Sequence, residues 1–226
     1  MVLKYYYDLI SEPSRALYIL LKINKIPFKK HPVNLLKFEN LTDEFKTKLN
    51  RFQKVPFIHD NDFILTESIA IVRYLSREYG IKDSLYPQDS KHQALVDEYL
   101  EWQHHNTRLL IALYTRHKLF KPLLTGDEPD LNLVSKYKRG VVKTMDKIEN
   151  LWLRDQKFIC GNILTVADIF AACEIEQPRM TGFDPTKGRP KLETWMNEVR
   201  KELDPVYSEA HLVLNELAAN NEKAKL

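Results

Sequence analysis

Cysteine is scarce in this sequence, and its scarcity limits the redox chemistry open to the chain. Only Cys160 and Cys173 occur among the 226 residues. Two cysteines are too few for a disulfide framework, and their spacing is not that of a C-x-x-C pair. The sequence therefore excludes disulfide-stapled and dithiol redox proteins, and it fits a reducing compartment.

Long apolar runs and a marked excess of one charge are absent as well. No run approaches the roughly 20 apolar residues that a membrane helix needs, and the first residues lack the pattern of a secretion signal. The 34 basic and 31 acidic side chains leave a net charge of +3, which requires no nucleic-acid partner. Hydrophobic residues make up 44% of the chain, enough for one or two cores. We expect a soluble, cytoplasmic, globular protein without a membrane span.

Residues 1–80 alternate between strand-like and helix-like patterns. The expected strands are residues 3–7, 28–33, 55–59 and 63–65, and the expected helices begin at Pro13, at Asp43 and near Ile69. Polar residues 60–62 suit a turn between the last two strands, and Gly80 suits the end of the last helix. The predicted order is strand, helix, strand, helix, strand, strand, helix (βαβαββα).

The sequence changes character after Gly80. Residues 81–90 include Pro87 and are interpreted as a linker, and residues 91–226 show helical periodicity without a strand signal. The predicted domains are therefore an α/β domain over residues 1–80 and an all-α domain over residues 91–226.

Two apolar stripes in the second domain each predict one long helix. The first stripe comprises Leu95, Tyr99, Trp102, Leu109 and Leu113, and the second comprises Val134, Tyr137, Val141, Met145, Ile148 and Trp152. Residues 121–130 are expected to separate the two helices. Further helices are expected near Thr165, Pro190 and Pro205, and residues 220–226 are expected to fray.

Ser11 lies where the first strand gives way to the first helix. Its hydroxyl would face the same space as the unpaired N–H groups of the helix start, a place that favours anions. A thiolate there would be stabilised by the helix end and by a hydroxyl hydrogen bond. The alternative is that Ser11 only caps the helix. Ser14 is a second hydroxyl nearby, expected in the first turn and pointing away.

Two further segments have features of a peptide-binding site. In Lys54-Val55-Pro56 a proline opens a strand, and such a proline is often cis, leaving the backbone of Val55 available to an extended peptide. The residues Thr66, Glu67 and Ser68 precede the third helix and suit a ligand carboxylate. Taken alone, these segments are also compatible with an ordinary edge-strand proline and with plain helix capping.

A fourth pattern, Thr165-Val166-Ala167-Asp168, has the form of a capping box with aspartate at its last position. We interpret it as structural. Replacing Asp168 should cost stability, on the order of 1 kcal/mol or more, rather than chemistry.

Taken together, these motifs resemble the cytosolic glutathione transferases, and most closely the theta class, over essentially the whole chain. The resemblance rests on residues 8–16 (DLISEPSRA), on the Lys54 and Glu67 segments, on residues 97–104 (DEYLEWQH) and on residues 188–192 (GRPKL). It implies a thioredoxin-like N-terminal domain, a helical C-terminal domain and a homodimer.

The resemblance also assigns roles. Ser11 would be catalytic and would hydrogen-bond the glutathione sulfur. Val55, before a cis-Pro56, would pair with the cysteinyl unit, and Glu67 and Ser68 would hold the γ-glutamyl end. Lys54 and Asn40 would face the glycyl carboxylate.

The chain departs from the family pattern at three positions. Asn40 and Leu41 stand where the family has histidine and lysine, which would weaken contacts to the glycyl carboxylate. Glu12 stands where the family has glutamine, and a carboxylate there would oppose ionisation of a nearby thiol unless it faces solvent or a cation.

Other transferase classes use a tyrosine late in the first strand. When the chain is aligned on Arg15, that tyrosine position falls on Leu9 and not on Tyr5, Tyr6 or Tyr7. We therefore favour Ser11 and interpret the three tyrosines as strand packing.

The electrophile is expected to bind between the two domains. The residues expected to contact it are Leu9, Ile10, Arg108, Tyr114 and Arg116. Arg108 matches an arginine of the theta-class substrate pocket, whose charge could assist a leaving group; the alternative is a solvated arginine on a helix face. His104, His105 and His117 lack the ligand set of a metal site, and no metal is expected.

The sequence thus predicts an enzyme that uses glutathione as co-substrate and conjugates it to alkyl or aralkyl halides or to epoxides, or reduces organic hydroperoxides. The alternatives are a non-catalytic relative that serves as an assembly module and a protein that sequesters hydrophobic ligands. The sequence does not identify the physiological electrophile.

Overall fold

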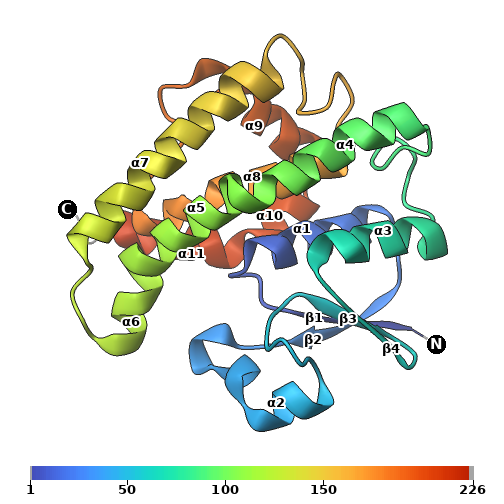
Figure 1. Ribbon diagram of the computed structural model, residues 1–226, viewed down its shortest axis with the longest axis horizontal. Helices are drawn as coiled ribbons and strands as arrows, with labels where there is room; N and C mark the ends of the chain where they lie inside the picture. The colour runs from blue at the N-terminus through green and yellow to red at the C-terminus, as the bar shows by residue number, and fades with distance from the viewer. Residues whose placement is uncertain (1, 224–226) are drawn as a thin grey trace. The chain divides into compact units, whose positions relative to one another are not determined.

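The computed structural model describes residues 2–223. The chain divides after Lys82 into two compact units. Figure 1 shows strands and helices in the first unit and helices throughout the second. The predicted α/β half and helical half are confirmed.

The first unit is built on a four-stranded sheet with the order β2-β1-β3-β4. Its strands are β1 (Leu3–Tyr7), β2 (Phe28–Pro32), β3 (Phe57–Asp60) and β4 (Phe63–Thr66), and its helices are α1 (Glu12–Ile23), α2 (Asp43–Lys48) and α3 (Ser68–Tyr79). β1 and β2 are parallel, and the other neighbouring strands are antiparallel. The order is the βαβαββα order predicted from the sequence, and Gly80 ends α3 in the left-handed region at φ 69°.

Aromatic side chains of β1 build the core on both faces of this sheet. The Tyr7 ring lies 5.7 Å from that of Tyr18 on α1, and α1 and α3 cover this face (Figure 1). Tyr6 points to the other face, where it joins Phe45 of α2 and Phe57 in a buried cluster. Alternation of side chains along β1 thus anchors helices on both sides of the sheet.

The second unit is all-helical within the described residues. Its α-helices are α4 (Ser90–Trp102), α5 (Thr107–Thr115), α6 (Lys121–Thr125), α7 (Leu131–Lys147), α8 (Val166–Glu176), α9 (Pro190–Leu203), α10 (Val206–Ala210) and α11 (Leu212–Lys223). Every residue of α8 is buried, so this helix forms the centre of the unit. The predicted starts near Thr165, Pro190 and Pro205 are confirmed.

The prediction of one long helix over the first apolar stripe is wrong. α4 ends at Trp102, a 3-10 turn follows (Gln103–His105), and α5 begins at Thr107. Asn106 explains the break, because its side-chain amide donates to the Trp102 carbonyl at 2.8 Å and so competes with the helical hydrogen bond. Leu95 and Leu109, two residues of the apolar stripe, are 48% and 44% exposed.

Two other boundaries also differ from the prediction. Residues 121–125, expected to lie in a connection, form α6, which Gly126 ends at φ 74°. Part of the tail expected to fray is helical, because α11 continues to Lys223; residues 224–226 lie outside the described residues. No helix over residues 2–223 is both long and apolar enough to cross a membrane.

The structural role predicted for Asp168 agrees with its contacts. The buried carboxylate accepts hydrogen bonds from the backbone N–H of Thr165 (2.9 Å) and of Ile159 (2.8 Å) and from the Trp195 indole (2.9 Å). Burial raises the pKa of Asp168, and these donors oppose that rise. Asp168 therefore ties the start of α8 to the preceding loop and to α9.

Candidate active site

The sheet brings four of the predicted binding segments to one of its ends. β1 and β2 are parallel, so the loop that carries Ser11 and the connection that carries Asn40 leave the sheet at the same end. β3 is antiparallel to β1 and begins there, after Lys54, Val55 and Pro56. Phe57 pairs with Thr66, so β4 ends there as well. The predicted segments are therefore neighbours within the first unit because of strand order and direction alone (Figure 1).

The loop before α1 is held from two sides by side chains whose roles the sequence did not reveal. The two carboxylate oxygens of Asp8 accept from the N–H groups of Ile10 and Leu35, each at 3.0 Å. The fully buried Arg15 donates to the carbonyls of Leu9 (2.9 Å) and Ile10 (3.3 Å). Both residues lie in the 8–16 motif, but motif position alone does not show which groups they bind. Together they fix the backbone that leads into Ser11.

Ser11 occupies the N-cap position of α1, with φ −86° and ψ 125°, and its side chain makes no capping hydrogen bond. Its carbonyl accepts the first helical bond from Arg15 N–H at 3.0 Å. Ser11 is half-buried, and its hydroxyl is positioned at the positive end of a 12-residue helix without being used to cap it. Ser14 lies inside the first turn, fully buried, and its Oγ has no hydrogen-bond partner among the described residues.

The segment before β3 lies just outside the strand pairing. Val55 is half-buried, Lys54 is exposed, and the Val55–Pro56 peptide bond is cis. The carbonyl of Lys54 accepts from the buried Asn50 side chain at 2.7 Å, which fixes the backbone on one side of Val55.

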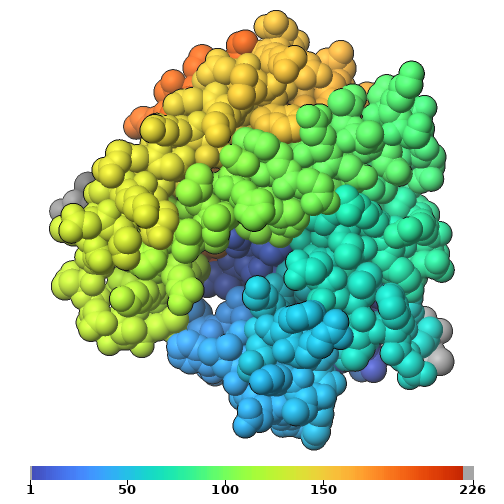
Figure 2. Space-filling view, in the orientation of Figure 1, coloured from blue at the N-terminus to red at the C-terminus, as the bar shows by residue number. Residues whose placement is uncertain are grey.

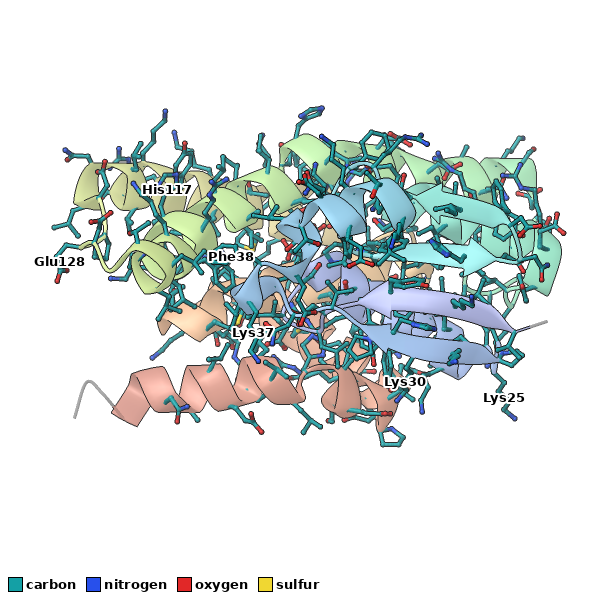
Figure 3. All side chains as sticks on the ribbon, turned by 90° about the horizontal axis from the view of Figure 1, so that it is seen from below. Lys25, Lys30, Lys37, Phe38, His117 and Glu128 are labelled. Atoms are coloured by element: carbon teal, nitrogen blue, oxygen red, sulfur yellow. The ribbon has the colours of Figure 1, made fainter. Side chains whose placement is uncertain are left out.

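Asn40 joins the connection after β2 to this same segment. Its side-chain amide donates to the carbonyl of Gln53 at 2.8 Å. Lys37 and Phe38 lie on the same connection (Figure 3), which together with α2 forms exposed surface of the first unit (light blue in Figure 2). One amide hydrogen of Asn40 thus serves to hold two loops together.

Glu67 has a backbone conformation that is unusual for a residue with a side chain. It is the N-cap of α3, with φ 67° and ψ 110°, and its side chain is exposed and makes no capping bond. Such a conformation costs of order 1–3 kcal/mol and concentrates at ligand-binding sites. Ser68 is 4% exposed and opens α3, so a second helix N-terminus lies at this end of the sheet.

Comparison with known proteins identifies the family to which this chain belongs. Residues 1–77 match the family "Glutathione S-transferase, N-terminal domain", and residues 108–202 match "Glutathione S-transferase, C-terminal domain". Glutathione S-transferase theta-1 of Bos taurus is 39% identical over 215 residues, which cover 95% of this chain and 89% of that protein. This chain belongs to the theta class of the glutathione S-transferases.

Solved structures of theta-class transferases have the same fold. The apo form of human glutathione-S-transferase T1-1 matches with a TM-score of 0.91 and 37% identity, covering 96% of this chain and 91% of that one. A human theta-class transferase in complex with the glutathione conjugate of 1-menaphthyl sulfate matches with a TM-score of 0.92 and 34% identity, covering 100% of this chain and 92% of that one. The predicted thioredoxin-like N-terminal domain and helical C-terminal domain are confirmed.

The three tyrosines of β1 pack in the core, as the sequence analysis predicted. Tyr5 is fully buried and its hydroxyl donates to the Ser14 carbonyl at 2.7 Å. The Tyr6 ring stacks on Phe57 at 4.4 Å, and Tyr7 is 9% exposed. All three side chains therefore belong to the core of the first unit.

Arg108 is not the solvated arginine that the sequence left open as an alternative. Its Nε donates to the Glu174 carboxylate at 2.9 Å, the Arg108 side chain is 20% exposed, and that of Glu174 is 1% exposed. This partner could not be predicted from sequence patterns, because the two residues lie 66 positions apart.

The other residues expected to contact the electrophile differ in exposure. Tyr114 is buried, its hydroxyl lies 3.1 Å from the Thr181 hydroxyl, and burial raises its pKa. Arg116 is exposed. In the first unit Leu9 is half-buried and Ile10 is buried. Among the described residues, no cluster of three or more His, Cys, Asp or Glu could hold a metal ion.

Proposed function

We propose that this protein conjugates glutathione to small electrophiles and that Ser11 activates the thiol. Its membership of the glutathione S-transferase family supports the reaction. The observation that carries the role of Ser11 is its position, at the N-terminus of α1 with a hydroxyl that does not cap the helix, at the sheet end where the other predicted segments gather.

The Ser11 hydroxyl would donate a hydrogen bond to the glutathione sulfur and so favour the thiolate over the thiol. The partial positive charge at the start of α1 acts in the same direction. The thiol proton leaves to solvent, and the thiolate attacks the electrophilic carbon as the leaving group departs with its bonding electrons. The enzyme contributes thiol ionisation and alignment.

Glutathione is an anionic peptide, and each segment near Ser11 offers groups that could bind one of its three residues. The backbone of Val55 would pair with the cysteinyl unit as an added strand does. Glu67 and Ser68, at the start of α3, would hold the γ-glutamyl end, and the exposed Lys54 would meet the glycyl carboxylate. Asn40 would support this end mainly by holding the Gln53 carbonyl.

For the electrophile we propose contacts with Leu9 and Ile10 from the first unit and with Arg108, Tyr114 and Arg116 from the second. The substrate classes are alkyl and aralkyl halides and epoxides, with organic hydroperoxides as an additional class. We further propose a cytoplasmic homodimer, in keeping with the family.

Paired serine variants test the proposal. Ser11→Ala should lower kcat/KM for a benzyl halide by about a hundredfold or more, the usual cost of removing one donor to a developing anion. Ser14→Ala is the matched control, because the Ser14 hydroxyl is buried without a partner among the described residues and its removal should leave kcat/KM near wild type. Equal activity of the two variants would overturn the role of Ser11.

A further inference from the structure

A row of basic side chains crosses the sheet of the first unit on the face that carries α2. In the sheet register, Lys4 of β1 lies between Lys29 of β2 and His59 of β3. His59 in turn pairs with Ile64 of β4. Side chains at paired positions of neighbouring strands point to the same face of a sheet. These four residues therefore form one continuous row, which we call the basic stripe.

α2 covers the next row of the sheet and leaves the basic stripe open. Tyr6 belongs to the buried cluster that contains Phe45 of α2, whereas both lysines of the stripe are exposed. Ile64 is 46% exposed. Val2, which alternation places on the same face as Lys4, is 55% exposed. This face thus presents cationic and apolar side chains together.

The two lysines of the stripe have no ion-pair partner within the described residues. Lys4 and Lys29 contact no carboxylate there. Asp60 ends β3 beside the stripe, but its carboxylate accepts from the hydroxyls of Tyr74 and Tyr79 on α3, each at 2.7 Å. Since α3 covers the opposite face of the sheet, this negative charge is directed away from the lysines.

The lysine charges also act on each other and on their neighbours. Lys4 and Lys29 are like charges at paired positions of adjacent strands, an arrangement that costs stability. Burial, together with the charges of Lys29 and Lys4, lowers the pKa of His31 in the next row. An anionic partner on this face would relieve the repulsion between the two lysines.

A hollow with further cations adjoins the basic stripe at Ile64. Its volume is about 230 Å³, and its lining includes Lys46, Arg51 and Thr66 as well as Ile64. The Arg51 guanidinium lies over the exposed Phe52 ring, 4.6 Å from its centroid, and makes no ion pair within the described residues. Two cations and a hydroxyl around a small hollow suit a phosphate group.

We propose that this face of the first unit binds the surface of an anionic phospholipid bilayer. The lysines would meet the phosphates and carboxylates of the headgroups, and Ile64 and Val2 would reach the boundary between headgroups and acyl chains. The exposed apolar side chains favour a bilayer over a soluble polyanion, because only a bilayer offers them an apolar environment. Lys4 lies in the first half of β1, whereas Ser11 follows the end of that strand, so this surface is separate from the proposed site of thiol activation.

Sedimentation with vesicles measures this binding. The wild type should bind vesicles of phosphatidylcholine with about one-third phosphatidylserine and should not bind vesicles of phosphatidylcholine alone. Binding should weaken when the salt concentration rises from about 0.1 M to about 0.5 M. Each lysine near an anionic surface contributes about fivefold to the partition coefficient. The double variant Lys4→Gln with Lys29→Gln should therefore lower that coefficient about twenty-fivefold.

The matched control is Lys143→Gln with Lys147→Gln, which changes the net charge equally at two exposed lysines of α7. It should leave the partition coefficient near the wild-type value. An equal loss in the two double variants would overturn the inference, because it would show that only net charge matters. Wild-type protein that binds neither kind of vesicle, or both equally, would overturn it as well.

Ile64→Ser separates a bilayer from a soluble polyanion. It should weaken vesicle binding about fivefold by removing an apolar side chain from the membrane boundary, and it should leave binding to inorganic polyphosphate unchanged. Vesicle binding that is the same in Ile64→Ser as in the wild type would refute the assignment to a bilayer. Thermal unfolding of every variant checks that a loss of binding does not come from a loss of folding.

Discussion

Ionisation of the buried carboxylate of Glu176 should make the stability of the second unit depend on pH. The carboxylate, 1% exposed at the end of α8, accepts from Arg200 at 2.9 Å and 2.6 Å and from the Tyr207 hydroxyl at 3.2 Å, and it is also paired with Arg179. Burial alone would raise the pKa of Glu176, but Arg200, Arg179 and His211 outweigh it and bring the pKa to about 2, from an ordinary value of 4.5.

The size of the effect follows from this shift. Each pKa unit corresponds to about 1.4 kcal/mol, so the ionised carboxylate contributes about 3 kcal/mol to the free energy of unfolding at pH 7. Because the folded pKa is lower than the unfolded one, the contribution is complete above about pH 4.5 and is lost as the pH falls toward 2. Glu176→Gln should therefore destabilise the protein by about 3 kcal/mol at pH 7 and by roughly half of that or less at pH 3.

Urea unfolding between pH 7 and pH 3 measures this difference. The matched control is Glu198→Gln, which removes an ion pair with Lys157 at 3.0 Å on the surface of α9 and should leave the unfolding midpoint near wild type at every pH. A Glu176→Gln penalty that stays constant over this pH range would refute the reasoning, because it would not depend on ionisation of the carboxylate.

Three further predictions concern the loops and α8. Asp8→Ala removes the acceptor of two backbone N–H groups and should lower kcat/KM about tenfold while the protein stays folded by circular dichroism. Asp168→Ala leaves buried donors unpaired and should cost about 3–5 kcal/mol in thermal unfolding, whereas the exposed Asp155→Ala should cost almost nothing. Asn40→Ala should weaken glutathione binding severalfold in calorimetry, because the Gln53 carbonyl loses its donor; unchanged affinity would refute this.

Local signals explain which parts of the fold were predictable. Strand alternation, the turn at residues 60–62 and Gly80 each act over a few residues, and they predicted the βαβαββα order. The strand order in the sheet then brings Ser11 and Val55 to the same end. The local sequence pattern alone was enough to predict these strands and helices.

Features that depend on one particular side-chain contact, near or distant in the chain, could not be predicted from periodicity. The break at Asn106 depends on a side chain competing with the backbone for the Trp102 carbonyl, which periodicity does not register. The Arg108–Glu174 pair joins two helices that local patterns treat independently. The role of Asp8 likewise depends on Leu35, 27 positions away.

The central claim is that Ser11 lowers the pKa of the bound glutathione thiol. Absorbance of the thiolate against pH, in the glutathione complexes of the wild type and of Ser11→Ala, measures this most directly. The account predicts a pKa at least about one unit lower than the roughly 8.5 of a free cysteine thiol in the wild type, returning toward that value in Ser11→Ala. An equal thiol pKa in both proteins would contradict it.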